Sequence, residues 1–261
     1  MNDAFTPPFD VRLMNATANV LLVVFCLAAL ASLARWAANH RVFAIAGISV
    51  SGELVHNNAL TLRANVAPRL SGNFFTLDLT QARQAFESIP WVRRAVVHRV
   101  FPNRIAVALQ EHQAVAYWGA EEGSRLLDNF GEVFEANVGE VEQEQLPRLD
   151  GPQGQAPQVL EMYRALQPLF AAIDLELEHL ALSGRGGWSA RLDSGAEIEL
   201  GRGSDDDVLA RTNRFLRTLT QVTSRYNRRP DAVESADLRH VDGYALRLRG
   251  VSTVVTESQK K

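Results

Sequence analysis

The chain has 261 residues, of which 46% are hydrophobic and 22% are charged, and its formal net charge at pH 7 is −3. This balance is that of an ordinary globular protein, and it lacks the basic excess expected of a nucleic-acid-binding protein. The length exceeds one typical domain, so we expect two folded units with accessory segments. The single cysteine, Cys26, excludes an internal disulfide and a zinc site built from cysteines.

An apolar segment near the N-terminus predicts a membrane anchor. Residues 13–34 carry no charged side chain, and Arg35 and Trp36 follow them. A helix rises about 1.5 Å per residue, so this segment would span about 33 Å, enough for a hydrocarbon core about 30 Å thick. We therefore expect a transmembrane helix over residues 13–36.

A cleaved signal peptide is the main alternative for this segment, because Ala29-Leu30-Ala31 fits a small-x-small cleavage site. The residues before the segment argue against it, since Arg12 is offset by Asp3 and Asp10. Charge alone does not set the orientation, because long soluble domains cross the membrane largely regardless of flanking charge. The flank after the segment carries Arg35, His40 and Arg41.

The next seventy residues predict a small α+β unit in the order strand, helix, helix, strand, strand. Alternating apolar residues indicate a strand at 43–52, and Asn58 caps the first helix. Residues 75–79 are expected to be extended, with Thr80 capping a second helix that Pro90 ends. Two strands then flank a Phe-Pro-Asn turn, at 91–100 and 104–112.

The segment "IPWVRRAVVHRVFPNRIAVALQEHQAVAYW" at 89–118 resembles the end of the POTRA domain in the FtsQ/DivIB family of bacterial cell-division proteins. A Pro-Trp-Val opening, alternating basic residues, an aromatic-proline turn and a Glu-His-x-x-x-Ala ending carry the resemblance. It implies an α+β architecture with one transmembrane helix, a β-α-α-β-β POTRA domain and a mostly antiparallel β domain with two helices. The implied ranges are a cytoplasmic tail at 1–12, the helix at 13–36, the POTRA domain at 43–112, the β domain at 113–250 and a polar tail at 251–261.

The remaining elements fit that second domain. Two short strands are expected around a turn at Asp128-Asn129, within residues 124–136. Amphipathic periodicity predicts helices at 157–173 and 204–222, and alternation predicts a hairpin at 188–201 between them.

The stretch "ADLRHVDGYALRLRG" at 236–250 reads as a last β-hairpin. A three-residue loop at 241–243, with Gly243 in the left-handed position, places the apolar residues on one face and sets Asp237 opposite Arg247. Little chain remains to pair with the last strand, although residues 252–256 could fold back over it. An uncovered strand edge can accept a strand from another chain, so we expect a partner segment to add to it.

No cluster of residues predicts a catalytic, metal or cofactor site. Asp205, Asp206 and Asp207 follow Ser204 at a helix start, where carboxylates cap the helix rather than bind metal. A strand-to-helix loop explains Gly201-Arg202-Gly203 better than an anion site. Glu111, His112 and His98 are expected on exposed strand faces, since no metal-binding or catalytic spacing connects them.

The resemblance therefore implies a non-enzymatic scaffold that is anchored in the inner membrane, faces the periplasm and is enriched at the division septum. Its implied partners are the coiled-coil proteins FtsB and FtsL, at the terminal hairpin, and upstream division proteins, at the POTRA domain. Two departures from the family are a tail at 1–12 that is not basic and His240 where an aromatic residue is frequent. An exported cell-wall enzyme and a POTRA receptor of an outer-membrane transport system are the alternatives. The implied partner-binding residues are Arg202, Arg239, His240, Asp242, Gly243, Tyr244, Ala245, Leu246 and Arg247.

Overall fold

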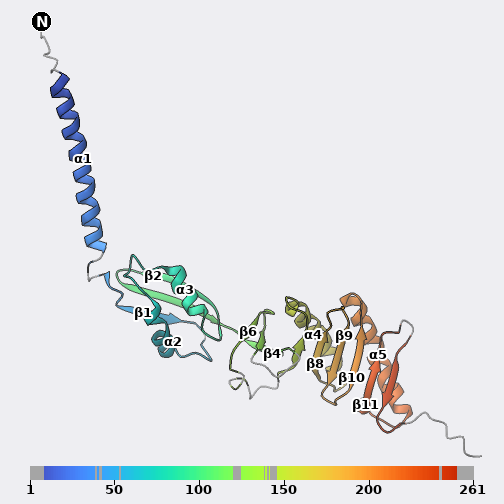
Figure 1. The fold of residues 1–261 in the computed structure, drawn as a ribbon. Coiled ribbons are helices and arrows are strands. Elements are labelled where there is room, and N and C mark those ends of the chain that lie inside the picture. Colours follow the sequence, from blue (N-terminus) through green and yellow to red (C-terminus); the bar gives the residue numbers. More distant parts are fainter. Residues whose placement is uncertain are drawn as a thin grey trace, which may run out of the picture. The chain divides into compact units, whose positions relative to one another are not determined.

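The computed structural model describes residues 9–38, 40, 43–52, 54–119, 125–137, 139, 141, 146–240 and 243–251. The chain forms two compact units that meet between Glu111 and His112. Figure 1 shows the N-terminal helix, a small α+β unit and a larger unit built on a long sheet. The α+β class predicted from the sequence is confirmed.

The N-terminal helix, α1 (Phe9–Ala38), is longer than the predicted 13–36 segment. Its 30 residues would extend about 45 Å at 1.5 Å per residue. An 18-residue window within Phe9–Trp36 has a mean hydropathy of 2.3, and none of it is buried within the protein. Within the described part of the chain, α1 is the one helix long and apolar enough to cross a membrane.

The rest of the first unit has the predicted POTRA order. The sheet order is β1-β3-β2, with β1 parallel to β3 and β3 antiparallel to β2. Leu62 of α2 and Phe86 of α3 enter one core with Ile105 and Val107 of β3. The elements are β1 (Gly47–Ser51), α2 (Ala59–Val66), the 3-10 turn η2 (Ala67–Arg69), α3 (Leu79–Glu87), β2 (Val92–Val100) and β3 (Arg104–Glu111).

Two local predictions in this unit were wrong. Residues 74–76 form a turn rather than the start of an extended segment, because the Asn73 side chain accepts hydrogen bonds from the amides of Phe75 and Thr76. The cap of α3 is Asp78 rather than Thr80. The Asp78 carboxylate accepts from the amides of Thr80 and Gln81 at 2.8 and 3.2 Å.

The second unit is built on a nine-stranded sheet of order β12-β11-β10-β9-β8-β7-β4-β5-β6. Most neighbouring strands are antiparallel, and the pairs β4–β7, β7–β8 and β10–β11 are parallel. The elements are β4 (Ala114–Trp118), β5 (Arg125–Asp128), β6 (Val133–Glu135), β7 (Arg148–Asp150), α4 (Ala156–Ala171), β8 (Leu177–Leu182), β9 (Trp188–Leu192), β10 (Glu197–Gly201), α5 (Asp205–Arg225), the 3-10 turn η4 (Pro230–Ala232), β11 (Val233–Asp237) and β12 (Ala245–Leu248).

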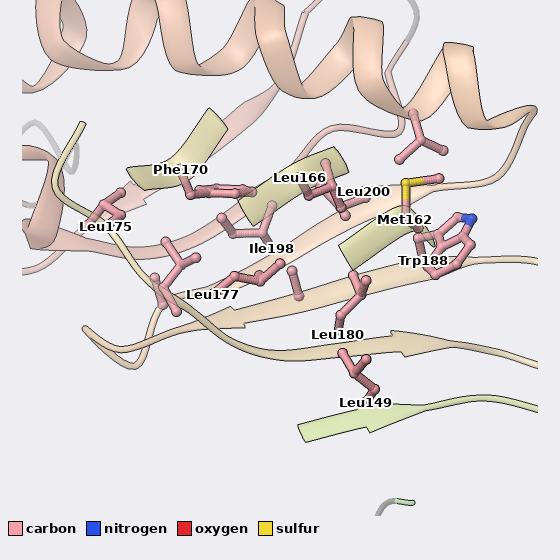
Figure 2. Close-up of a cluster of buried hydrophobic side chains, with 14 of the residues drawn as sticks. Leu149, Met162, Leu166, Phe170, Leu175, Leu177, Leu180, Trp188, Ile198 and Leu200 are labelled. Carbon is pink, nitrogen blue, oxygen red and sulfur yellow. The ribbon is translucent and has the colours of Figure 1, made fainter. Parts of the chain in front are cut away.

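Helices α4 and α5 contribute to one hydrophobic core with the sheet. Figure 2 shows Met162, Leu166 and Phe170 of α4 facing Trp188 and Ile198 of the strands. All five side chains are at most 2% exposed. The capping role predicted for the start of α5 is confirmed, because Ser204 and Asp207 form a reciprocal capping box.

The register predicted for the last hairpin was wrong by two residues. Asp237 lies opposite Ala245, and Arg247 lies opposite Ser235. The strand β11 ends earlier than expected because the Asp237 carboxylate binds Arg239, two residues along the chain. A shift of two residues keeps the same side chains on the buried face, so Leu238 and Leu248 are buried as predicted.

Candidate functional site

The last strand, β12, lies at one end of the nine-stranded sheet. Among the described residues, β11 is the one strand that pairs with it. Leu248 is buried on the core face and Leu246 is partly buried, whereas Ala245 and Arg247 are exposed. The strand is therefore held by one face and one edge.

The backbone of β12 presents some of its amides on the side away from β11. The Arg249 amide donates to the Ala232 carbonyl at 2.9 Å, on the β11 side. Peptide direction alternates along an antiparallel strand, so the amides of Arg247 and Ala245 also face β11. Those of Leu246 and Leu248 then face away from β11.

The end of β10 and the loop after it pack against the hairpin where β11 ends, at Arg239. Gly201 has φ +84°, and a Cβ placed on it would lie 2.9 Å from Cγ of Arg239. Leu238 donates its amide to the Glu199 carbonyl at 2.8 Å, which continues the contact of β11 with β10. Arg211 of α5 donates to the Arg202 carbonyl at 2.7 Å. The Gly-Arg-Gly loop and the hairpin, far apart in sequence, are thus neighbours.

Arg239 is held by a local ion pair with Asp237. Its Nε and Nη2 donate to the two carboxylate oxygens at 2.9 and 2.6 Å, and its backbone amide donates at 3.0 Å. These bonds lower the pKa of Asp237 to about 2, so the carboxylate is charged at every physiological pH. The pair fixes the backbone where β11 ends.

Tyr244 anchors the start of β12 to α5. Its hydroxyl is 2.7 Å from Oγ1 of Thr218, and its ring meets Phe215 edge-to-face with centroids 5.0 Å apart. The ring also lines a small hollow with Arg211, Arg214, Leu238, His240 and Gly243. Sequence reasoning missed the α5 residues of this hollow, although the spacing of Arg211 and Arg214 on one helical face is a readable signal.

The other predicted partner-binding residues lie around the same end of the sheet. Arg202, His240 and Arg247 are exposed, and Arg247 forms a surface ion pair with Glu234 at 3.1 Å. Asp242 lies outside the described residues, as does the tail from 252 onward. Within the described residues, the outer edge of β12 is unpaired and arginines lie around it.

Glu111 and His112 do not lie on exposed strand faces, so that prediction was wrong. The Glu111 side chain is 5% exposed, and that of His112 is 11% exposed. His112 Nδ1 is 2.8 Å from the fully buried Asp128 carboxylate, and its ring stacks on Phe134. His98 is exposed, as predicted.

His112, Asp128 and Glu132 offer ligand atoms within 4.8 Å of one another, the one such cluster in the described part of the chain. Their geometry is explained without a metal ion. One oxygen of Asp128 accepts from the amides of Phe130 and Glu132, and the other meets His112. The Asp128 carboxylate thus stabilises the turn between β5 and β6 and links this turn to His112, the first residue of the second unit.

Comparison with known proteins assigns both units to described families. Residues 43–112 match the POTRA domain of the FtsQ type, and residues 116–239 match the family described as "Cell division protein FtsQ/DivIB, C-terminal".

Similar proteins cover nearly the whole chain. The chain is 40% identical to the cell division protein FtsQ of Burkholderia pseudomallei over 254 residues, which are 97% of this chain and 99% of that protein. It is 39% identical to FtsQ of Thiomonas arsenitoxydans, over 94% of this chain and 89% of that protein. Identity to FtsQ of Bordetella pertussis is 36%, over 92% of each chain.

Proposed function

Because the chain belongs to the FtsQ/DivIB family of cell division proteins, we propose that it is a non-enzymatic, membrane-anchored scaffold of the division machinery. Its helix α1 is long and apolar enough for a single-pass inner-membrane protein. The proposed arrangement is a cytoplasmic tail at 1–12, the membrane helix at 13–36, and periplasmic POTRA and β domains at 43–112 and 113–250, with a polar tail at 251–261. The protein would be enriched at the division septum.

The proposed partners at the terminal hairpin are FtsB and FtsL, which bind by adding a strand to β12. The observation that carries this proposal is the outer edge of β12, whose amides at Leu246 and Leu248 face away from β11. Main-chain hydrogen bonds would supply much of the affinity. Around the strand, Arg202, Arg239, His240, Asp242, Gly243, Tyr244, Ala245 and Arg247 would complete the contact.

Charge around β12 supports an acidic partner segment. Arg247 is exposed on β12, and Arg202 lies in the loop after β10. Arg249 follows the strand, and its guanidinium donates to the Ser194 carbonyl. Electrostatic complementarity of this kind fixes the register of an incoming strand more than it adds affinity. Upstream division proteins would bind the POTRA domain, a separate surface of the same chain.

A substitution at Leu246 separates strand addition from side-chain recognition. Leu246→Pro removes the outward amide and the leucine side chain, whereas the matched control Leu246→Ala removes the side chain alone. We expect co-purification of FtsB and FtsL from detergent-solubilised membranes to be lost with proline and largely retained with alanine. Hydrogen exchange of α5 checks that both variants are folded. If the folded proline variant bound both partners as the alanine variant does, strand addition at β12 would be wrong.

A further inference from the structure

The POTRA unit carries an apolar patch at the end where the chain enters it from α1. Phe75 is 49% exposed, Val100 is 39% exposed and Phe101 is 74% exposed. We call these three residues the anchor-proximal patch. Neither the POTRA core nor the terminal hairpin uses them, and exposed apolar clusters of this kind mark binding surfaces.

Hydrogen bonds bring the patch together from three separate segments. The Phe43 carbonyl, at the entry to the unit, accepts from the Phe74 amide at 2.9 Å. The Ala46 amide donates to the Asn103 carbonyl at 2.9 Å, which holds the turn after β2 beside the same entry segment. The entry, the 73–77 turn and the 101–103 turn thus meet at one end of the sheet.

Aromatic packing and one arginine fix the patch further. Ring centroids of Phe43 and Phe75 are 4.8 Å apart, and the buried Phe74 ring lies 5.2 Å from Phe75 and 6.1 Å from Phe101. Arg99 donates to the carbonyls of Phe74, Phe75 and Leu77 at 2.5, 3.3 and 2.7 Å. The exposed rings are therefore held on a preformed surface.

Chain length keeps this surface near the membrane. Helix α1 ends at Ala38, and Trp36 and Arg35, in its last turn, are typical of the interface. Five residue steps separate Ala38 from Phe43, so the two lie at most about 18 Å apart. Phe43 is itself packed on Phe75, so the patch is confined to the zone next to the headgroups.

We propose that the anchor-proximal patch docks on the phospholipid surface beside α1, with Phe75 and Phe101 in the interfacial layer and Arg104 at the lipid phosphates. Arg104 is exposed at the start of β3, next to the turn that carries Phe101. Aromatic and aliphatic side chains insert into this layer, and a basic side chain beside them is attracted to anionic headgroups. The contact would orient the POTRA unit on the membrane and leave the β2 edge of its sheet accessible.

Fluorescence quenching in nanodiscs tests this contact in the full chain. The background is Cys26→Ser, with one new cysteine at Phe101→Cys or Val55→Cys labelled with the fluorophore NBD. Val55 is the matched control, because it is 82% exposed and lies at the other end of β3. Its amide donates to Glu111, and Glu111 is about 23 Å along β3 from Arg104. The discs contain phosphatidylethanolamine, phosphatidylglycerol and a lipid with a nitroxide near its headgroup.

We expect several-fold stronger quenching and a bluer emission at position 101 than at 55. Elution of the chain with the discs shows separately that α1 is inserted. Equal quenching at the two positions would overturn the proposal, as would a solvent-like signal at 101, which would leave the patch to a protein partner. Adding Arg104→Gln should weaken quenching at 101, and an unchanged signal would remove Arg104 from the contact. No division partner is present, so the result does not depend on the function proposed for β12.

Discussion

The absence of a side chain at Gly201 allows the terminal hairpin to pack against the end of β10 at Arg239. Its φ is +84°, and a Cβ there would approach Cγ of Arg239 to 2.9 Å. Gly186 makes a matched control, because its φ is +76° and a Cβ there would meet nothing within 4 Å. Alanine at Gly186 should therefore cost about 1 kcal/mol of backbone strain alone, and alanine at Gly201 should cost about 1–2 kcal/mol more.

Hydrogen exchange of the full chain in detergent measures the difference. Gly201→Ala should lose protection in β11 and β12 and bind FtsB and FtsL more weakly, while Gly186→Ala should keep both properties. Similar effects of the two substitutions would mean that the contact between Gly201 and Arg239 does not support the hairpin.

At the scale of elements, Glu111 ties the end of β3 to the loop before α2. Its carboxylate accepts from the amides of Val55, His56 and Asn57 at 2.8, 3.0 and 3.0 Å, and from Nδ2 of Asn57 at 2.8 Å. Burial raises the pKa of Glu111, but these four bonds outweigh it and hold the pKa below the ordinary value of 4.5. The carboxylate is therefore charged at neutral pH.

Glu111→Gln should destabilise the POTRA unit by about 2–3 kcal/mol at pH 7. The NH2 group of the glutamine would face the N–H donors of residues 55–57, from which the carboxylate oxygens now accept hydrogen bonds. A carboxylate with a lowered folded pKa contributes stability above its unfolded pKa and loses it as the pH falls through the folded value. The difference in unfolding free energy between wild type and variant should therefore become smaller below about pH 4. Urea unfolding monitored by exchange of the 55–57 amides measures it, with the 69% exposed Glu197→Gln as control. If this difference in unfolding free energy did not change with pH, the charge of the Glu111 carboxylate would not be what stabilises the unit.

Sequence periodicity predicted the elements that are long or strongly alternating. The helices α4 and α5 and the hairpins β2–β3 and β9–β10 were predicted close to their observed bounds. The strands β4, β7 and β8 were missed. The three residues of β7 are too few to show a pattern of their own, and its neighbours β4 and β8 in the sheet define it. Tertiary contacts, not local propensity, decide such strands.

The candidate site was predictable only in part, for the same reason. Alternation in residues 236–250 indicated a half-buried strand near the end of the chain. The register depended on the ion pair between Asp237 and Arg239, and the support of Tyr244 depended on Thr218 and Phe215 of α5. These contacts join residues whose proximity only the fold determines.

At the scale of the whole molecule, the proposed topology places both folded units on the periplasmic side of one uncleaved anchor. Flanking charges do not favour it, since Asp3 and Asp10 precede the apolar segment at 13–34 and Arg35 follows it. Both folded units follow α1 in the chain, and long soluble segments cross the membrane largely regardless of such charges. In the proposed topology, export of the soluble part sets the orientation.

A reporter that is active only in the periplasm, fused after Lys261, should therefore be active, and deletion of residues 13–36 should abolish its activity. Mass spectrometry of the purified protein should find the N-terminal segment still attached, because the charges before the apolar stretch are poor for a signal peptide. An inactive fusion in a folded, membrane-bound protein would reverse the orientation. A mature N-terminus near Ser32, after the Ala29-Leu30-Ala31 sequence, would instead mean that the apolar segment is a cleaved signal peptide. The POTRA unit would then have no membrane helix to keep the anchor-proximal patch near the lipid surface.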